Sequence, residues 1–196
     1  MRKYKNLSQA FGTIAKGYAY DSPLGRAPVH QIVLAPSASG VADVLASTVL
    51  ADGAVTVVTS GISNPDVYRT VSITGNQGSI TGDVVVLGKD WAGRSLSETI
   101  TSDGTNTVNG LIPFVSIDKI TLPARNNPSD ELSVGITDLL GLQRPIDLAA
   151  DVLRVISSGV VDANATADAT EGTISLQDRA ADGVIDVIID YLSPQL

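Results

Sequence analysis

The sequence predicts an all-β protein: an Ig-like or jelly-roll-like β-sandwich with an extended N-terminal arm and a C-terminal β-hairpin region. Two observations carry this prediction. Short runs of Val, Ile and Thr are separated throughout by Gly, Asn, Asp, Ser and Pro, which is the composition of strands and turns. The turn residues recur about every ten residues, the spacing expected of a sandwich or a barrel.

The expected strands follow one another along most of the chain. They are QIVLA (31–35), AVTVVTS (54–60), VYRTVSITG (67–75), DVVVLG (83–88), SLSETIT (95–101), FVSIDKITL (114–122), ELSVGI (131–136), VLRVIS (152–157) and GTISL (172–176). Alternation places Val67, Val71 and Ile73 of the third strand on one face. In the fifth strand it does the same for Leu96 and Ile100. The fourth strand is apolar on both faces, so we expect it in a sheet interior or between two layers.

Two further segments fit either a helix or a strand. Residues 39–53 have apolar side chains at helical spacing, but their β-branched content favours an extended structure. A helix through residues 184–192 would align Asp186 and Asp190 with the preceding Asp182 at i, i+4 spacing, where like charges repel. We therefore predict a strand there, paired with residues 172–176 in a hairpin.

The length of 196 residues fits one substantial β-domain with a smaller annex and an arm. Gly141 and Pro145 lie near a change in charge, so the best internal boundary is there. We predict an extended N-terminal arm at 1–30, the main β-sandwich at 31–142, and a C-terminal β region at 143–196. This last region is expected to pack on the sandwich or to continue it.

Charge is distributed unevenly along the chain, which has 13 basic and 21 acidic residues and a net charge of −8. The start of the arm is basic, whereas residues 147–196 carry nine acidic and two basic side chains. The acidic body argues against specific nucleic-acid binding, because phosphates require concentrated Lys and Arg. The arm is either a solvated terminus or a segment that docks on an acidic neighbour. Its proposed partner-binding residues are Arg2, Lys3, Tyr4 and Lys5.

Composition excludes several kinds of site. The chain has no cysteine and one histidine, which excludes disulfides, thiolate metal sites and a multi-histidine metal site within one chain. No apolar run approaches the roughly 18 residues of a membrane-spanning helix, and the first residues lack the apolar segment of a signal peptide. We therefore expect a protein made in a cytoplasm, without membrane contact. Aromatic residues make up only 4%, a mild indication that assembly completes its stability.

The chemical motifs are weak, and we expect no catalytic residue, no cofactor and no metal ligand. Residues 162–171 place oxygen-bearing side chains at alternate positions, as a calcium loop does. However, Ala167 and Thr173 stand where an EF-hand needs Gly and Glu, so a mobile polar loop is expected. His30 has no accompanying nucleophile motif and is expected to be structural or exposed. The scattered aspartates leave a carboxylate pair for glycoside hydrolysis as a formal alternative.

The single tryptophan, Trp91, lies in VVVLGKDWAG (84–93). Gly88, Asp90 and Gly93 are turn formers between two expected strands, so the segment is predicted to be a hairpin connection. We expect the indole to fold back over its own sheet. The alternative is that it anchors a neighbouring subunit, because tryptophan is enriched at interface hot spots.

Several segments, taken in order, resemble the β-rich virion structural proteins of tailed bacteriophages. They are ASGVADVLASTVLADGAVTVVTSGISNPDVYRTVSITGN, GDVVVLGKDWAGRSLSETIT, PFVSIDKITLPA and DELSVGITDLLGL, and the most telling parts are GKDWAGRSLSETI and SIDKITLPA. The similarity spans residues 36–192. It implies an architectural component of the particle, with no enzymatic residues to carry over.

The resemblance implies a capsid decoration, cement or minor capsid protein that stabilises the head lattice of the virion, assembled in the host cytoplasm. Its partners would be the major capsid protein or neighbouring virion subunits, and a homo-oligomer such as a trimer is expected. A tail-tube or head–tail connector subunit is the alternative. A second alternative is a carbohydrate-binding β-module in which Trp91 stacks on a sugar.

Overall fold

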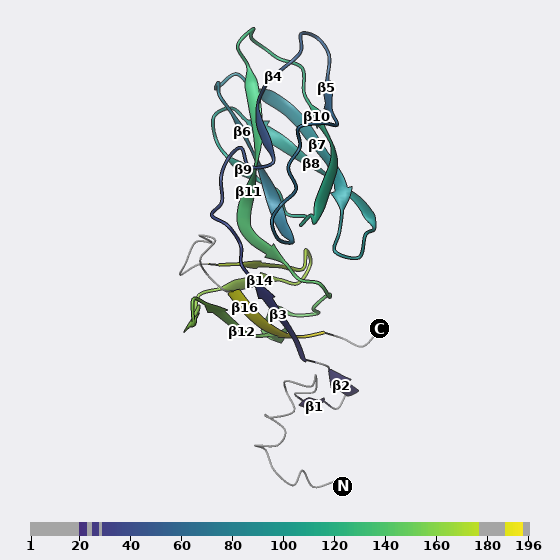
Figure 1. Ribbon diagram of the computed structural model, residues 1–196, viewed down its shortest axis with the longest axis vertical. Coiled ribbons are helices and arrows are strands. Elements are labelled where there is room, and N and C mark those ends of the chain that lie inside the picture. Colours follow the sequence, from purple (N-terminus) through teal and green to yellow (C-terminus); the bar gives the residue numbers. More distant parts are fainter. Residues whose placement is uncertain (1–19, 23–24, 28, 177–186, 194–196) are drawn as a thin grey trace.

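The protein is nearly all β. Its computed structural model describes residues 20–22, 25–27, 29–176 and 187–193. Most of these form strands in antiparallel sheets, which confirms the predicted fold class. The one helical element in these ranges is the short 3₁₀ turn η1 (Ala149–Asp151). Figure 1 shows an elongated molecule with a two-layered sandwich at one end, a smaller sheet below it, and the paired strands β1 (Tyr20–Ser22) and β2 (Gly25–Ala27) beyond that sheet.

The sandwich consists of two sheets around one core. The first has the order β5-β10-β7-β8 and comprises β5 (Thr56–Val58), β7 (Thr81–Lys89), β8 (Ser95–Asp103) and β10 (Ser116–Leu122). The second contains β4 (Leu45–Val49), β6 (Arg69–Gly75), β9 (Val108–Asn109) and the first half of β11 (Glu131–Gly141). Val84, Ile120 and Leu132 are fully buried between them. The extended structure favoured for residues 39–53 is confirmed over β4, in the middle of that segment.

The strand faces predicted for the sandwich are mostly confirmed. In β6, Val71 and Ile73 point into the core, and in β8 Ile100 is buried while Leu96 packs against the same core. The apolar strand β7 lies in the interior of its sheet, between β10 and β8. Val67 differs, because it lies before β6 and packs against a second core.

The second core lies beneath a four-stranded C-terminal sheet with the order β13-β12-β16-β3. Its strands are β3 (Val29–Leu34), β12 (Val152–Ser157), β13 (Val160–Val161) and β16 (Val187–Leu192). The opposite layer is formed by the end of β11 with β15 (Thr173–Ser175) and β14 (Thr166–Asp168). Ile174 and Ile189 are fully buried between the layers, and Tyr191 is nearly so.

Pairing among the C-terminal strands differs from the prediction. The strand expected within residues 184–192 is confirmed as β16, but the hairpin with residues 172–176 is wrong. β15 pairs with β11 and β14, whereas β16 pairs with β12 and β3. The physical reason is that β15 and β16 contribute Ile174 and Ile189 to the same core from opposite layers, and so cannot share a ladder.

Strand β3 lies with the C-terminal sheet, whereas the sequence predicts its residues from position 31 onward in the sandwich. It pairs with β16 along its whole length and points Ile32 into the second core. The chain therefore enters the smaller sheet first, passes into the sandwich after Leu34, and returns along β11. That long strand joins the two regions, because Leu132 belongs to the first core and Leu140 to the second.

Candidate binding surfaces

A fully buried arginine lies where the two cores meet. The register between β11 and β6 shifts midway along β11, and there Arg69 Nε donates a hydrogen bond to the carbonyl oxygen of Thr137 at 2.7 Å. Arg69 Nη1 donates to the Ser37 carbonyl at 3.0 Å and to Asp66 Oδ1 at 2.9 Å. Its Nη2 lies 3.6 Å from Asp138 Oδ1. A buried charge is costly unless it is paired in this way, so this cluster, the Arg69 junction, fixes how the two regions meet.

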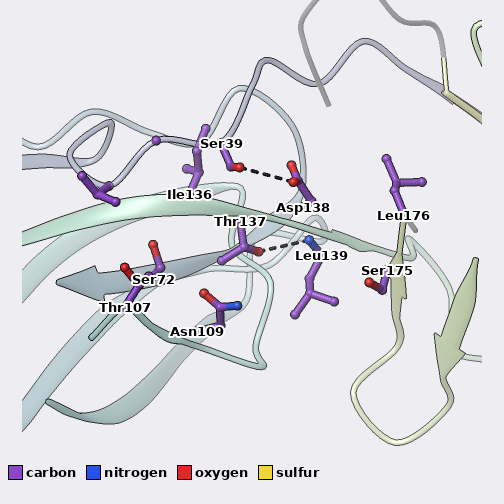
Figure 2. A pocket seen from close by; sticks show the side chains of 12 residues that line it. Ser39, Ser72, Thr107, Asn109, Ile136, Thr137, Asp138, Leu139, Ser175 and Leu176 are labelled. Atoms are coloured by element: carbon purple, nitrogen blue, oxygen red, sulfur yellow. Dashed lines mark hydrogen bonds between the residues drawn. The ribbon is translucent and has the colours of Figure 1, made fainter. Parts of the chain in front are cut away.

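A polar pocket of about 390 Å³ opens beside the junction, as Figure 2 shows. Its polar lining residues are Ser39, Ser72, Thr107, Asn109, Thr137, Asp138 and Ser175. Ser39 Oγ donates to Asp138 Oδ2 at 3.3 Å, and the Leu139 backbone N–H donates to Thr137 Oγ1 at 3.1 Å. The lining offers hydroxyl, amide and carboxylate groups to a hydroxylated ligand or to water. The residues described around it place no histidine or lysine beside a hydroxyl, which is the pairing that activates a nucleophile.

The hairpin tip between β7 and β8 is held by one buried carboxylate, and the predicted hairpin connection is confirmed. Asp90 is 6% exposed and accepts hydrogen bonds from the backbone N–H groups of Ala92 and Arg94, both at 2.9 Å, and from Arg94 Nε at 2.7 Å. Burial raises the pKa of Asp90, but these hydrogen bonds and the Arg94 charge lower it overall. The position of Trp91 is therefore set by an ordered turn.

Trp91 borders a groove of about 500 Å³ between the hairpin tip and loops of the C-terminal region. Its side chain is 43% exposed and belongs to neither hydrophobic core of the described residues. Tyr68, Arg94, Arg144 and Glu171 also line this groove. Burial and the nearby hairpin carboxylate raise the pKa of the Tyr68 hydroxyl to about 12, so it stays protonated. The groove therefore offers a half-open aromatic surface among charges of both signs.

The outer face of the C-terminal sheet carries a row of aliphatic side chains across all four strands. Val33 of β3 lies opposite Ile188, Ile188 opposite Ile156, and Ile156 opposite Val161 of β13. The two central isoleucines are half-buried, while Val33 is 60% and Val161 54% exposed. We call these four side chains the aliphatic row. Contiguous apolar side chains of this kind are typical of surfaces that contact other proteins.

A polar row runs parallel to the aliphatic row, at a distance of two residues on each of three strands. Gln31 lies opposite Asp190, which lies opposite Arg154. Asp190 Oδ1 accepts a hydrogen bond from Gln31 Nε2 at 2.8 Å, and Asp190 Oδ2 accepts from Arg154 Nε at 3.0 Å and Nη2 at 2.5 Å. The polar groups on this face are thus paired with one another. Sequence reasoning missed both rows, although alternation within VHQIVL and VIIDYL was a signal for them.

His30 lies on the inner side of the C-terminal sheet. Its ring centroid is 5.5 Å from that of Tyr191. Burial and the charge of Arg144 lower its pKa, which favours the neutral imidazole. His30 therefore packs beside the second core and does not line the polar pocket or the Trp91 groove.

The segment at residues 162–171, expected to be a polar loop, contains strand β14. Ala165, Ala167 and Ala169 pack against the second core. Asp168 Oδ1 accepts hydrogen bonds from the backbone N–H groups of the next turn, so it closes a turn. In the part of the chain that the structure describes, no three potential ligand side chains are grouped to hold a metal ion.

The remaining predicted site residues, Arg2, Lys3, Tyr4 and Lys5, lie outside the described residues. Within the described ranges, no helix has the length and hydropathy needed to cross a membrane. Comparison with known proteins gives no match to a family model, a curated protein or a solved structure. The virion resemblance therefore remains a prediction from the sequence.

Proposed function

We propose that this protein is a non-enzymatic structural subunit of a tailed-bacteriophage particle, a capsid decoration protein that stabilises the head lattice. The observation that carries the proposal is the outer face of the C-terminal sheet. There the aliphatic row leaves Val33 and Val161 more than half exposed on a face whose polar groups are already paired with one another. Such a face gains from being covered by another protein.

Three aspartates that hold turns and the Arg69 junction also support an architectural role. Asp90 holds the hairpin tip, Asp66 pairs with Arg69, and Asp130 accepts hydrogen bonds from the backbone N–H groups of Asn126 and Asn127. Each carboxylate therefore fixes a turn or a junction. A catalytic acid or base instead faces a pocket beside the group that it activates.

The test is to locate the protein on particles by immunogold electron microscopy, with an epitope-tagged copy expressed in the cells that produce them. Label on the head is expected, whereas label on the tail would favour the tube or connector alternative. Purified particles without any label would contradict a virion role. A glycan screen with a hit that depends on Trp91 would favour the carbohydrate-binding alternative instead.

A matched pair of variants tests which surface is used. Val161→Lys changes the aliphatic row, and Val57→Lys changes an equally exposed valine on β5 of the sandwich; the two side chains are 54% and 56% exposed. Head label is expected to be lost with the first variant and kept with the second. Equal labelling with both variants would show that another surface holds the particle.

A further inference from the structure

Among the described strands, β3 has an open edge. It is the last strand of the C-terminal sheet and pairs with β16 over six residues, and no other described strand pairs with its opposite edge. Edge strands usually carry charged residues, proline or bulges that prevent pairing with another chain. The β3 sequence VHQIVL contains no acidic or basic residue other than His30, no proline, and no register shift against β16. This edge is therefore a template for one more strand.

We propose that the open edge of β3 pairs antiparallel with β3 of a second copy of this chain, about a twofold axis. Such an interface brings the same surface of both copies together, so the surface must complement itself. Directly opposed residues of an antiparallel pair lie on the same face of the sheet, so their positions in β3 differ by an even number. The twofold axis must therefore pass at a residue of β3 and not between two residues. Only Gln31 and Ile32 give a paired region that covers most of β3.

The rows on the outer face select between these two axes. With the axis at Gln31, Val33 of each copy lies opposite Val29 of the other, and Gln31 lies opposite Gln31. With the axis at Ile32, Gln31 would lie opposite Val33, and the polar row would run into the aliphatic row. The alternation V-x-Q-x-V in β3 is symmetric about Gln31, which is the pattern that a twofold contact requires.

This dimer would join two four-stranded sheets into one continuous sheet. Val33, 60% exposed in one chain, would be covered by the other copy, next to a Val29 side chain that is already buried. The two aliphatic rows would then lie on the same face of the joined sheet, which doubles the apolar surface available to a further partner. The inference does not depend on a virion role, because strand pairing needs only this chain.

Disulfide trapping tests the axis directly, because the natural chain has no cysteine. Opposed residues of an antiparallel pair have Cα atoms about 4.5–5.5 Å apart, within the range of a disulfide. Gln31→Cys is therefore expected to give a cross-linked dimer on a non-reducing gel after mild oxidation. In the matched control Val33→Cys the two cysteines lie four residues out of register, about 13 Å apart, so it should stay uncross-linked. The proposal would be overturned if Gln31→Cys gave no cross-linked dimer, or if both variants cross-linked equally.

Sedimentation of the unmodified chain provides the second measurement. A mass twice the 20.2 kDa of one chain is expected at micromolar concentration. Val33→Lys should weaken the dimer about tenfold, whereas Val57→Lys should leave it unchanged. A monomer at every concentration, or a trimer, would overturn the inference. A monomer that still labels virion heads would leave the proposed function standing, whereas a cross-linked dimer missing from particles would refute only that function.

Discussion

The sandwich and the C-terminal sheet are built from similar strands, yet they treat their two faces differently. The sandwich closes its core between two sheets, and Val84 and Ile120 are fully buried there. The C-terminal sheet buries Ile189 on one face but leaves Val33 60% exposed on the other. Alternation thus supplies an apolar inner face in both regions. Among the described residues, only the smaller sheet also carries an aliphatic row on an outer face without a second layer, which makes this region the one suited to assembly.

The largest effect is expected at the Arg69 junction, which connects the two regions. Removing the fully buried Arg69 side chain leaves a cavity and leaves the Thr137 and Ser37 carbonyls without their donor, at an expected cost of about 3–5 kcal/mol. Arg69→Ala should lower the free energy of unfolding by that amount in urea denaturation. The control is Arg125→Ala, whose partner Asp52 is 81% exposed, with an expected cost of about 0–1 kcal/mol. Equal losses of unfolding free energy in the two variants would mean that the Arg69 junction stabilises the fold no more than the exposed pair does.

Matched cavities test whether the two regions unfold together. Ile120→Ala in the sandwich and Ile189→Ala in the smaller sheet each remove a fully buried side chain, at an expected cost of about 2–5 kcal/mol. Because β11 contributes to both cores, we expect one transition in which circular dichroism and Trp91 fluorescence coincide. A separate early transition in Ile189→Ala alone would show that the smaller sheet unfolds independently.

Acid is expected to weaken the sandwich and the junction through three carboxylates. Burial raises the pKa of Asp66, Asp90 and Asp130, but hydrogen bonds and nearby arginines lower each of them overall. A lowered folded-state pKa contributes stability that is present above the ordinary value of about 4 and lost as the pH falls through the folded-state value. These three carboxylates should therefore leave the unfolding free energy nearly unchanged from about pH 7 to 5 and lower it below about pH 4.

Asp66→Asn and Asp90→Asn should each reduce this acid-dependent loss, measured as the difference in unfolding free energy between neutral and acidic buffer. Glu98 has the opposite sign: burial raises its pKa above the ordinary value despite two backbone hydrogen bonds, so its contribution is lost as the pH rises through the folded-state pKa. A stability that rises steadily on acidification would indicate that Glu98 outweighs the three aspartates.

A smaller effect is expected at Trp91, which borders the groove between the two regions. Its ring is 43% exposed and lies outside both cores, so Trp91→Ala should lower the unfolding free energy by only about 1 kcal/mol. Loss of particle binding with the fold intact would identify it as an anchor for a neighbour. A loss as large as that of the core variants would place its role in the fold.

Much of the fold could be predicted because strands have a local signature, whereas pairing does not. Alternation identified β6, β8 and β16, but the layer joined by β15 depends on contacts between residues far apart in the sequence. The same alternation also places two charged side chains at inward positions. Arg69 shares the inward parity of Val71, and Glu98 that of Ile100, and both charged side chains are buried. A charge at an inward position of a predicted strand indicates a buried polar contact, and at Arg69 it marks the junction. The open edge of β3 has no such local signal, because an edge exists only once the sheet order is known.

The smallest effect on stability is also the sharpest test of the difference between the two regions. Val161→Lys and Val57→Lys replace valines of nearly equal exposure, and each should change the unfolding free energy by no more than about 0.5 kcal/mol, as surface substitutions do. Their retention on a hydrophobic-interaction column should differ, because only Val161 belongs to a continuous aliphatic row. Retention should fall clearly for Val161→Lys and little for Val57→Lys. An equal fall would mean that the outer face of the smaller sheet is no more adhesive than the sandwich, and the surface proposed for assembly would then have to lie elsewhere.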